Sequence, residues 1–475
     1  MAPALYFGIE FEFCIGYVKP GTLNPDPSSA FFTDFPISND SIEEALRTSV
    51  EVSWEGLTRE ELFTEPNLSI DDVFLPVARK YIGKTFLEAG LPYDPNNDEE
   101  ADIKNWHIGA DVSVDTSPDL NVPDEANYYW FPMEIVSPAY EFNAENLSAI
   151  EKVCKLLSTK YLTKVNESTG MHVHFSIGIA AGSPIWSFNS LQNLLQFFWA
   201  FHTQFDTLHP AHRQNNEYAR SMRVYALMID RFYKKWNCLP TPIQGVIELG
   251  NYDELTELLR AVRKGGKDRY MAYNTANLVN LLVDPDKLRE FDLSQRKPTI
   301  EFRQHGGTLD GQTARKWVET LGGVIKWLED VHPQSLMELL SVTAEEKWEK
   351  VGEGADTINE EKYGPVLAEG RFTIIDLLEH IGLQEQANFY RSRVNKLVTQ
   401  PRKYEADNYA WSHLGEESML AINPDFESDV WGYAHKEELR EIWYEQMRLK
   451  YFLPNLIFDP DATMWPEHRQ RVPNE

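Results

Sequence analysis

The chain has 475 residues, and its 42% hydrophobic and 12% aromatic content is typical of a globular protein with a substantial core. Its 45 Lys and Arg residues stand against 74 Asp and Glu residues, which gives a formal net charge of −29. This negative charge would repel polyphosphate backbones and anionic lipids, so we expect no nucleic acid and no membrane among the partners. A small phosphate ligand is compatible with it, because such a ligand needs only a local cluster of cations.

Three cysteines, Cys14, Cys154 and Cys238, are few and far apart in the sequence. This usage favours a reducing compartment over a disulfide framework. The N-terminus runs directly into a strand-like stretch without a basic leader, and the longest apolar run, Leu194–Phe201, is too short to span a bilayer. We therefore expect a cytoplasmic protein.

The first predicted element is a strand over residues 5–15, where the sequence GIEFEF alternates strictly and places Glu10 and Glu12 on one face. Residues 17–105 read as an irregular insertion rich in Pro, Asn, Asp and Ser, with helices predicted at 40–49 and 70–89. We expect this acidic insertion to be mainly a solvated surface, and a binding lid is the alternative.

Two more strands are predicted, over 106–114 and over 128–136. In the first of them, Asp111 and Ser113 are two residues apart and so lie on the same face. Asn143 is a candidate cap for a helix over 144–161. This helix has one apolar stripe, formed by Leu147, Ile150, Val153, Leu156 and Leu157.

The segment TGMHVHFS at 169–176 predicts a strand with His172 and His174 on one face and apolar residues on the other. Long helices are expected at 187–207 and 252–264, and another at 312–331. A strand over 298–304 places Glu301 and Arg303 on one face. Between these elements, residues 209–236 hold a basic cluster that includes Arg213, Arg220, Arg223, Arg231, Lys234 and Lys235.

From residue 332 the texture changes to mixed helices, at 343–353 and 373–397, and then to a Trp- and Tyr-rich tail at 404–475. We therefore predict a catalytic domain over 1–331 and a mainly helical extension over 332–475. No pattern indicates a particular oligomeric state.

Four predicted strands alternate apolar side chains with charged or imidazole ones. The polar members are Glu10 and Glu12, Glu134, His172 and His174, and Glu301 and Arg303. Taken singly, a Glu-x-Glu strand is usually a solvated face and a Glu-x-Arg strand is commonly an ordinary ion pair. Four strands with agreeing parity are much harder to explain as surface, so we interpret them as one sheet that lines a polar cavity.

So many carboxylates cannot stay ionised in a partly buried cavity without cations. Hard divalent ions bound by carboxylate oxygens and an occasional His are the natural partners, and Mg²⁺ keeps room for substrate phosphates. Arg303 beside Glu301 is suited to neutralising a γ-phosphate, so the set indicates phosphoryl transfer. Zinc chemistry is not indicated, because the chain has no His-Glu-x-x-His motif and no second Cys or His cluster.

These residues resemble the amidoligase family, a branch of the carboxylate–amine ligase superfamily that includes glutamine synthetase and glutamate–cysteine ligase. The matching segments follow one another between about residues 4 and 325: GIEFEF (8–13), a W-x-x-x-x-D-x-S pattern ending at Asp111 and Ser113, MEIVSP (133–138), TGMHVHFS (169–176), RYMAYN (269–274) and TIEFRQHGGTLD (299–310). TGMHVH is also similar to the Gly-x-His-x-His strand of glutamine synthetase, and IEFR is similar to its Ile-Glu-x-Arg strand.

The resemblance implies an α+β fold like that of glutamine synthetase, in which a curved antiparallel sheet forms a funnel backed by helices. It implies ATP and two or three Mg²⁺ or Mn²⁺ ions inside the funnel. By matching position, Glu12 and Glu134 would hold one metal ion, while Glu10, His172 and Glu301 would hold another.

By the same resemblance, His174 would lie near the ATP phosphates and Arg303 would contact the transferred phosphoryl group. Further candidates for contact with phosphate or the substrate carboxylate are Arg213, Arg220 and Arg269, followed by Asn274 and Asp111.

The activity that the resemblance implies is the ATP-dependent joining of a carboxylate to an amine, each a small molecule or a peptide. ATP converts the carboxylate to an acyl phosphate, the amine attacks, and an amide remains. Water must be excluded meanwhile, so we expect loops to close over the funnel, with the insertion at 17–105 and the C-terminal extension as candidates. The alternatives are a phosphotransferase of the same fold that acts on an amine or guanidino group, and a non-enzymatic binding or structural relative.

Overall fold

The computed structural model describes residues 4–18, 70–96, 103–119, 128–178, 186–214, 218–236, 240–263, 268–282, 298–345, 372–391 and 393. These residues form helices and antiparallel strands, which confirms the expected α+β class. The chain divides into two compact units. The first comprises Met1–Ser183, Phe291–Lys297 and His305–Val318, and the second comprises Pro184–Glu290, Pro298–Gln304 and Glu319–Glu475.

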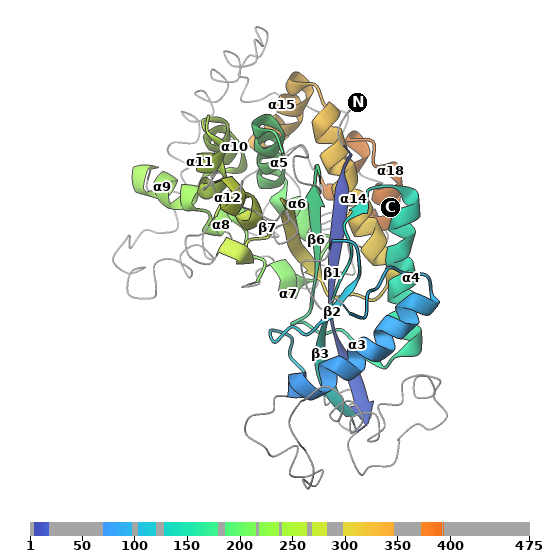
Figure 1. Ribbon diagram of the computed structural model, residues 1–475. Coiled ribbons are helices and arrows are strands. Elements are labelled where there is room, and N and C mark those ends of the chain that lie inside the picture. The colour runs from blue at the N-terminus through green and yellow to red at the C-terminus, as the bar shows by residue number, and fades with distance from the viewer. Residues whose placement is uncertain are drawn as a thin grey trace, which may run out of the picture. The chain divides into compact units, whose positions relative to one another are not determined.

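The first unit contains an antiparallel sheet centred on its longest strand, β1 (Figure 1). Its strands are β1 (Tyr6–Val18), β2 (His107–Gly109), β3 (Tyr128–Val136), β4 (Tyr140–Glu141), β5 (Thr163–Lys164) and β6 (Gly170–Ser176). β1 lies between β3 and β6, β2 pairs with β3, and the short β4 and β5 pair with β1.

Alternation along β1 separates an apolar face from a polar one, as the sequence predicts. Phe7, Ile9, Phe11 and Phe13 are at most 1% exposed and share the apolar face. The same face of the neighbouring strands carries the buried side chains of Met133, Ile135, Met171, Val173 and Phe175. The acids and imidazoles therefore share the other face.

Two helices of the first unit, α3 (Ile70–Glu88) and α4 (Ala144–Lys160), contribute to its core. α4 begins as predicted, because the Oδ1 atom of Asn143 accepts the Asn146 N–H at 3.0 Å. α3 confirms the helix expected at 70–89. Its Ala78, Ile82 and Phe86 are fully buried, so the expectation of a mainly solvated surface is wrong for this part of the predicted insertion.

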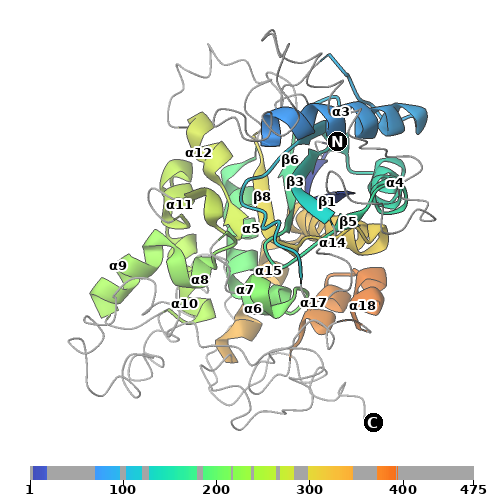
Figure 2. The same ribbon diagram turned by 90° about the horizontal axis from the view of Figure 1, so that it is seen from below.

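The second unit is mostly helical, and its helices α8 to α12 group together (Figure 2). Its elements are α5 (Phe188–Ala200), α6 (His202–Asp206), α7 (Ala211–Gln214), α8 (Met222–Tyr225), α9 (Leu227–Trp236), α10 (Pro242–Gly250), α11 (Leu255–Ala261), η3 (Asp268–Tyr270), β7 (Tyr273–Asn274), α12 (Ala276–Leu282), α15 (Pro333–Ser341), η4 (Val342–Glu345), α17 (Ile374–His380) and α18 (Gln384–Arg391). β8 (Ile300–Gly306) and α14 (Gly311–Asp330) each run from one unit into the other.

In the second unit β7 and β8 form an antiparallel pair, and α5 packs against one face of it. The Phe198 ring lies 4.8 Å from that of Tyr273 and 5.1 Å from that of Phe302. Because side chains alternate along a strand, Glu301 and Arg303 of β8 point away from this aromatic packing.

Three sequence predictions need correction. The helix expected over 373–397 is divided into α17 and α18, and Gly382 between them has a φ of +80°. The strand expected over 106–114 ends at Gly109, because the Asp111 side chain accepts the Ser113 N–H at 2.7 Å and holds the chain in a turn. The helix expected over 187–207 is divided at Phe201 into α5 and α6. The helix predicted at 40–49 and the tail at 404–475 lie outside the described residues.

Within the described ranges, no helix combines the length and the apolar content that a membrane crossing requires.

Candidate functional site

The register of β1 with its two neighbours brings five predicted site residues of the first unit to adjacent positions. Glu10 is paired with His172 of β6, and Glu12 is paired with Glu134 of β3. His174 follows two residues along β6. Residues directly opposite one another on antiparallel strands point to the same face, so these five side chains form one polar cluster.

Within this cluster, Glu10 lies between two imidazoles. Its Oε2 atom is 3.1 Å from Nδ1 of His172, and its Oε1 atom is 2.8 Å from Nε2 of His174. Burial by itself would raise the pKa of Glu10. The charge attraction of His174 and the hydrogen bonds of His172 and His174 outweigh burial and hold this pKa well below its ordinary value. Glu10 is therefore an ionised carboxylate at neutral pH.

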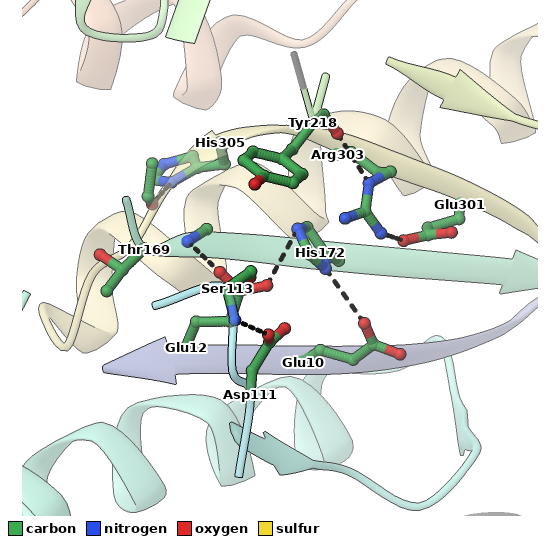
Figure 3. Close-up of polar contacts among 12 residues, drawn as sticks. Glu10, Glu12, Asp111, Ser113, Thr169, His172, Tyr218, Glu301, Arg303 and His305 are labelled. Atoms are coloured by element: carbon green, nitrogen blue, oxygen red, sulfur yellow. Dashed lines mark hydrogen bonds and ion pairs between the residues drawn. The ribbon is translucent and has the colours of Figure 1, made fainter. Parts of the chain in front are cut away.

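Glu12 is held by a backbone amide and by the same imidazole. Its side chain is almost fully buried, and Oε2 accepts the Gly170 N–H at 2.6 Å. Its Oε1 atom is 3.4 Å from Nε2 of His172. His172 therefore contacts both acids of β1 (Figure 3).

Glu12, Asp111 and Glu134 form a second group, in which one ligand oxygen from each residue lies within 4.8 Å of the others. Glu134 comes from β3. Glu12 of β1 and Asp111 of the turn after β2 are drawn in Figure 3. Two oxygens bound to the same hard cation at about 2.0–2.6 Å are separated by at most about 4–5 Å. The spacing and the all-oxygen donor set therefore fit a divalent cation such as Mg²⁺.

In the second unit, Glu301 and Arg303 of β8 form an ion pair between Oε1 and Nη1. Arg303 Nε also donates to the backbone oxygen of Tyr218 at 2.9 Å (Figure 3). Asn274, which is paired with Glu301 across β7 and β8, donates its Nδ2–H to Glu301 Oε2 at 2.5 Å. The predicted meeting of Glu301 with Glu10 and with His172 stays a prediction.

The three other predicted arginines lie in different surroundings. Arg213 is buried and braces β8, since Nη2 donates to the Arg303 oxygen at 2.7 Å and Nε is 3.5 Å from the Gln304 oxygen. Arg269 is exposed and donates to the Tyr270 hydroxyl at 2.8 Å. Arg220 is half-buried, and its backbone N–H donates to the Tyr270 oxygen at 2.7 Å. A ligand role for each of them stays a prediction.

Sequence reasoning missed a buried polar network behind β8. The Tyr273 hydroxyl lies 2.9 Å from Nε2 of Gln304 and 3.2 Å from Nδ1 of His202, and Asp206 contacts both Gln304 and His202. Burial, followed by the charge of Asp206, raises the pKa of Tyr273 well above its ordinary value. These residues lie on the face of β8 opposite Glu301, so the charge pattern gave no signal for them.

The sequence also gave no signal for two backbone groups that hold site residues, the Gly170 amide and the Tyr218 carbonyl. Every residue carries such groups, so only the folded chain reveals which of them contact a carboxylate or a guanidinium.

Comparison with known proteins gives one finding. A family model described as "putative amidoligase enzyme" matches residues 3–325. Neither the curated proteins nor the solved structures gave a match.

Proposed function

This chain belongs to the amidoligase family, and on that premise we propose that it is an ATP- and Mg²⁺-dependent ligase that joins a carboxylate to an amine. The observation that carries the proposal is the cluster on β1, where Glu10, Glu12 and their partners share one buried polar face. Natural folds avoid concentrating acids in this way unless cations or chemistry require it.

Glu12, Glu134 and Asp111 would hold one divalent cation, and their converging oxygens support this assignment. Glu10 and His172, with Glu301 as the resemblance implies, would hold a second. Mn²⁺ is an acceptable substitute, because its preference for oxygen and imidazole ligands is similar. Bound cations of this kind neutralise ATP phosphates and the charge that moves between them.

The proposed reaction has two steps. The acid's carboxylate oxygen attacks the γ-phosphorus of ATP, the bond to the β–γ bridging oxygen breaks, and ADP leaves with that electron pair. The amine nitrogen then attacks the carbonyl carbon of the acyl phosphate, phosphate departs with the C–O electrons, and nitrogen loses a proton. Phosphorylation is needed because an unmodified carboxylate has only oxide as its leaving group.

Arg303 is the proposed partner of the transferred phosphoryl group, with Glu301 as a residue that both orients it and binds metal. The guanidinium is fixed in advance by Glu301 and by the Tyr218 carbonyl, so little reorganisation accompanies the development of charge. His174 is proposed to lie near the ATP phosphates. Arg213, Arg220 and Arg269 remain candidates for the phosphates or the substrate carboxylate.

A glutamine synthetase-like funnel is part of the proposal, and so is the closing of loops to exclude water from the acyl phosphate. We expect the substrates to be amino acids, small peptides or related metabolites. A non-enzymatic relative is less well supported, because the full set of Glu10, Glu12, Glu134, His172 and Glu301 is present.

The deciding experiment incubates the purified chain with Mg-ATP and pooled carboxylates and amines, and then detects products by mass spectrometry. The expected product has the mass of one acid plus one amine minus water, and ADP should form only when both are present. ADP formed with an amine or guanidino acceptor alone would support the phosphotransferase instead.

A matched variant links this activity to the site. Glu301→Gln should abolish ATP turnover while the far-UV circular dichroism stays unchanged, since the amide keeps the size of the side chain but lacks its charge. Turnover equal to that of the unaltered chain would remove Glu301 from the proposed metal site.

A further inference from the structure

The turn that precedes β6, residues 166–169, is closed by its own side chains. Asn166 Oδ1 accepts the Ser168 N–H at 3.0 Å and the Ser168 hydroxyl at 2.6 Å. The Thr169 hydroxyl donates to the backbone carbonyl oxygen of Asn166 at 2.8 Å. The Asn166 side chain is therefore the centre of the turn, and it also reaches beyond it.

On one side, this turn holds the loop that carries Asp111. Asn166 Nδ2 donates to the backbone carbonyl oxygen of Asp115 at 2.6 Å, and the backbone N–H of Asp115 donates to Ser168 Oγ at 2.7 Å. Both backbone groups of Asp115 are thus fixed. Between these two aspartates, the Val114 N–H donates to the backbone carbonyl oxygen of Asp111 at 3.2 Å. Asp111 is therefore connected to Asn166 through a short, hydrogen-bonded path.

The loop has a second anchor in the core. Val114 is 5% exposed and packs in a small cluster with Cys14 and Trp130. The loop therefore leaves the core at Val114, is held at Asp115, and presents Asp111 to Glu12 and Glu134.

On its other side, the same turn holds Glu12. Gly170, the next residue, donates its N–H to Glu12 Oε2 at 2.6 Å. The turn is fixed there as well, because the Gly307 N–H donates to the Thr169 oxygen at 2.8 Å, and a Cβ atom at Gly307 would lie only 2.0 Å from Thr169 Oγ1. One turn therefore positions two of the three converging carboxylates.

We propose that Asn166 is a positioning residue for the cation site of Glu12, Asp111 and Glu134, and that it acts through Asp115 on Asp111. The inference rests on the proposed function, because it presumes that these carboxylates bind a cation. Residues that orient metal ligands typically change metal affinity by about 10–100-fold when they are removed. The Asn166 side chain is not among the proposed ligands, so its contribution is to geometry.

The test measures Mn²⁺ binding to the full chain without nucleotide, from the electron paramagnetic resonance signal of the free ion. Asn166→Ala should raise the Mn²⁺ dissociation constant of one site about tenfold, and that site is the one lost in Glu134→Gln. The matched control is Asn146→Ala, which removes an asparagine Nδ2 bond of similar length, 2.9 Å to the Glu141 oxygen, elsewhere in the same unit. Its Mn²⁺ affinity should equal that of the unaltered chain.

A double-mutant cycle separates the positioning of Asp111 from a general destabilisation of the first unit. If Asn166 acts through Asp111, Asn166→Ala should weaken Mn²⁺ binding no further in an Asp111→Asn background. An equal further loss in that background would overturn the inference. Should Asn166→Ala fail to fold, Ser168→Ala removes only the acceptor of the Asp115 N–H and the bond to Asn166, and the same results are expected.

The outcomes also distinguish this inference from the proposed function. If Glu134→Gln loses one bound Mn²⁺ per chain while Asn166→Ala binds Mn²⁺ as the unaltered chain does, the positioning role is overturned and the cation site stays intact. A chain that does not bind Mn²⁺, or that binds it equally well with Glu134→Gln, would overturn the proposed cation site and the inference with it.

Discussion

Single residues of one type have very different surroundings in this chain, and the arginines illustrate this best. Arg303 is mostly buried and contacts both Glu301 and the Tyr218 carbonyl. Arg315 pairs with Glu151 at 3.4 Å, where both side chains are more exposed. Exposed ion pairs contribute about 0–1 kcal/mol. The two arginines therefore form a natural comparison between a site residue and a surface residue.

Arg303→Lys should lower kcat of the proposed ligation about 10²-fold, a loss typical of removing one preorganised donor to a developing charge. A lysine ammonium is a point charge and cannot reproduce the planar contacts of the guanidinium with a carboxylate and a carbonyl. Arg315→Lys is the control and should leave kcat unchanged. Equal effects of the two substitutions would contradict a role for Arg303 in phosphoryl transfer.

Cys154 provides a prediction on stability. Burial raises the pKa of its thiol to about 12, and the negative charge of Asp310 adds to the rise. The raised pKa contributes stability below about pH 9, and this contribution is lost as the pH rises toward 12, because the unfolded thiol ionises first.

The free energy of unfolding should therefore fall by about 1.4 kcal/mol more between pH 8 and pH 10 in the unaltered chain than in Cys154→Ala. Urea titrations of both proteins at the two pH values measure this difference. Parallel pH profiles would show that the thiol ionises equally well in the folded and unfolded states.

At the scale of elements, strands and turns differ in how far the sequence predicts them. A strand has a strict period of two, so the parities of Glu10, Glu12 and Glu134 predicted that these residues share a face. The turn at Asp111 is set by one side-chain hydrogen bond to Ser113, which competes with strand pairing and leaves no periodic signal. The predicted strand was therefore too long.

The hydrogen bonds from Arg213 of α7 to the backbone of β8 allow a test at this scale. Arg213→Met should lower the free energy of unfolding by about 2 kcal/mol, because the Arg303 carbonyl loses a buried charged donor. If the main role of Arg213 is to stabilise β8 through these hydrogen bonds, KM for ATP should stay unchanged in the folded fraction. A large rise in KM with unchanged stability would instead support the predicted phosphate contact. Urea unfolding and steady-state kinetics distinguish the two results.

At the scale of the whole molecule, the family match ends at residue 325, while the described chain continues to residue 393. Composition and motifs predicted the α+β class, the family and most of the cluster on β1. They did not predict how the helices after residue 332 pack, because an apolar stripe shows that a helix packs against something without indicating its partner. The boundary at residue 331 was predicted only from the change in composition and helical pattern along the sequence.

The later helices contribute to the core of the second unit. The ring of Phe372 lies 6.0 Å from that of Phe201 at the end of α5. The side chain of Leu383 occupies the space beside Gly323 of α14, where a Cβ atom would lie 2.6 Å from it. Leu377 and Leu378 are fully buried. Burying a large apolar side chain contributes about 1.5–3 kcal/mol, so these helices stabilise residues within the family match.

Truncation tests the boundary directly. A chain of residues 1–331 should lose cooperative unfolding, or unfold at a much lower temperature, and should bind a hydrophobic dye, because the apolar surfaces around Phe201 and Gly323 become exposed. The control is a chain of residues 1–393, which keeps every residue that forms these contacts and should unfold cooperatively, with a clearly higher midpoint than residues 1–331. Equal midpoints for the two truncated chains would establish residues 1–331 as an independent domain, with the later helices as a dispensable extension.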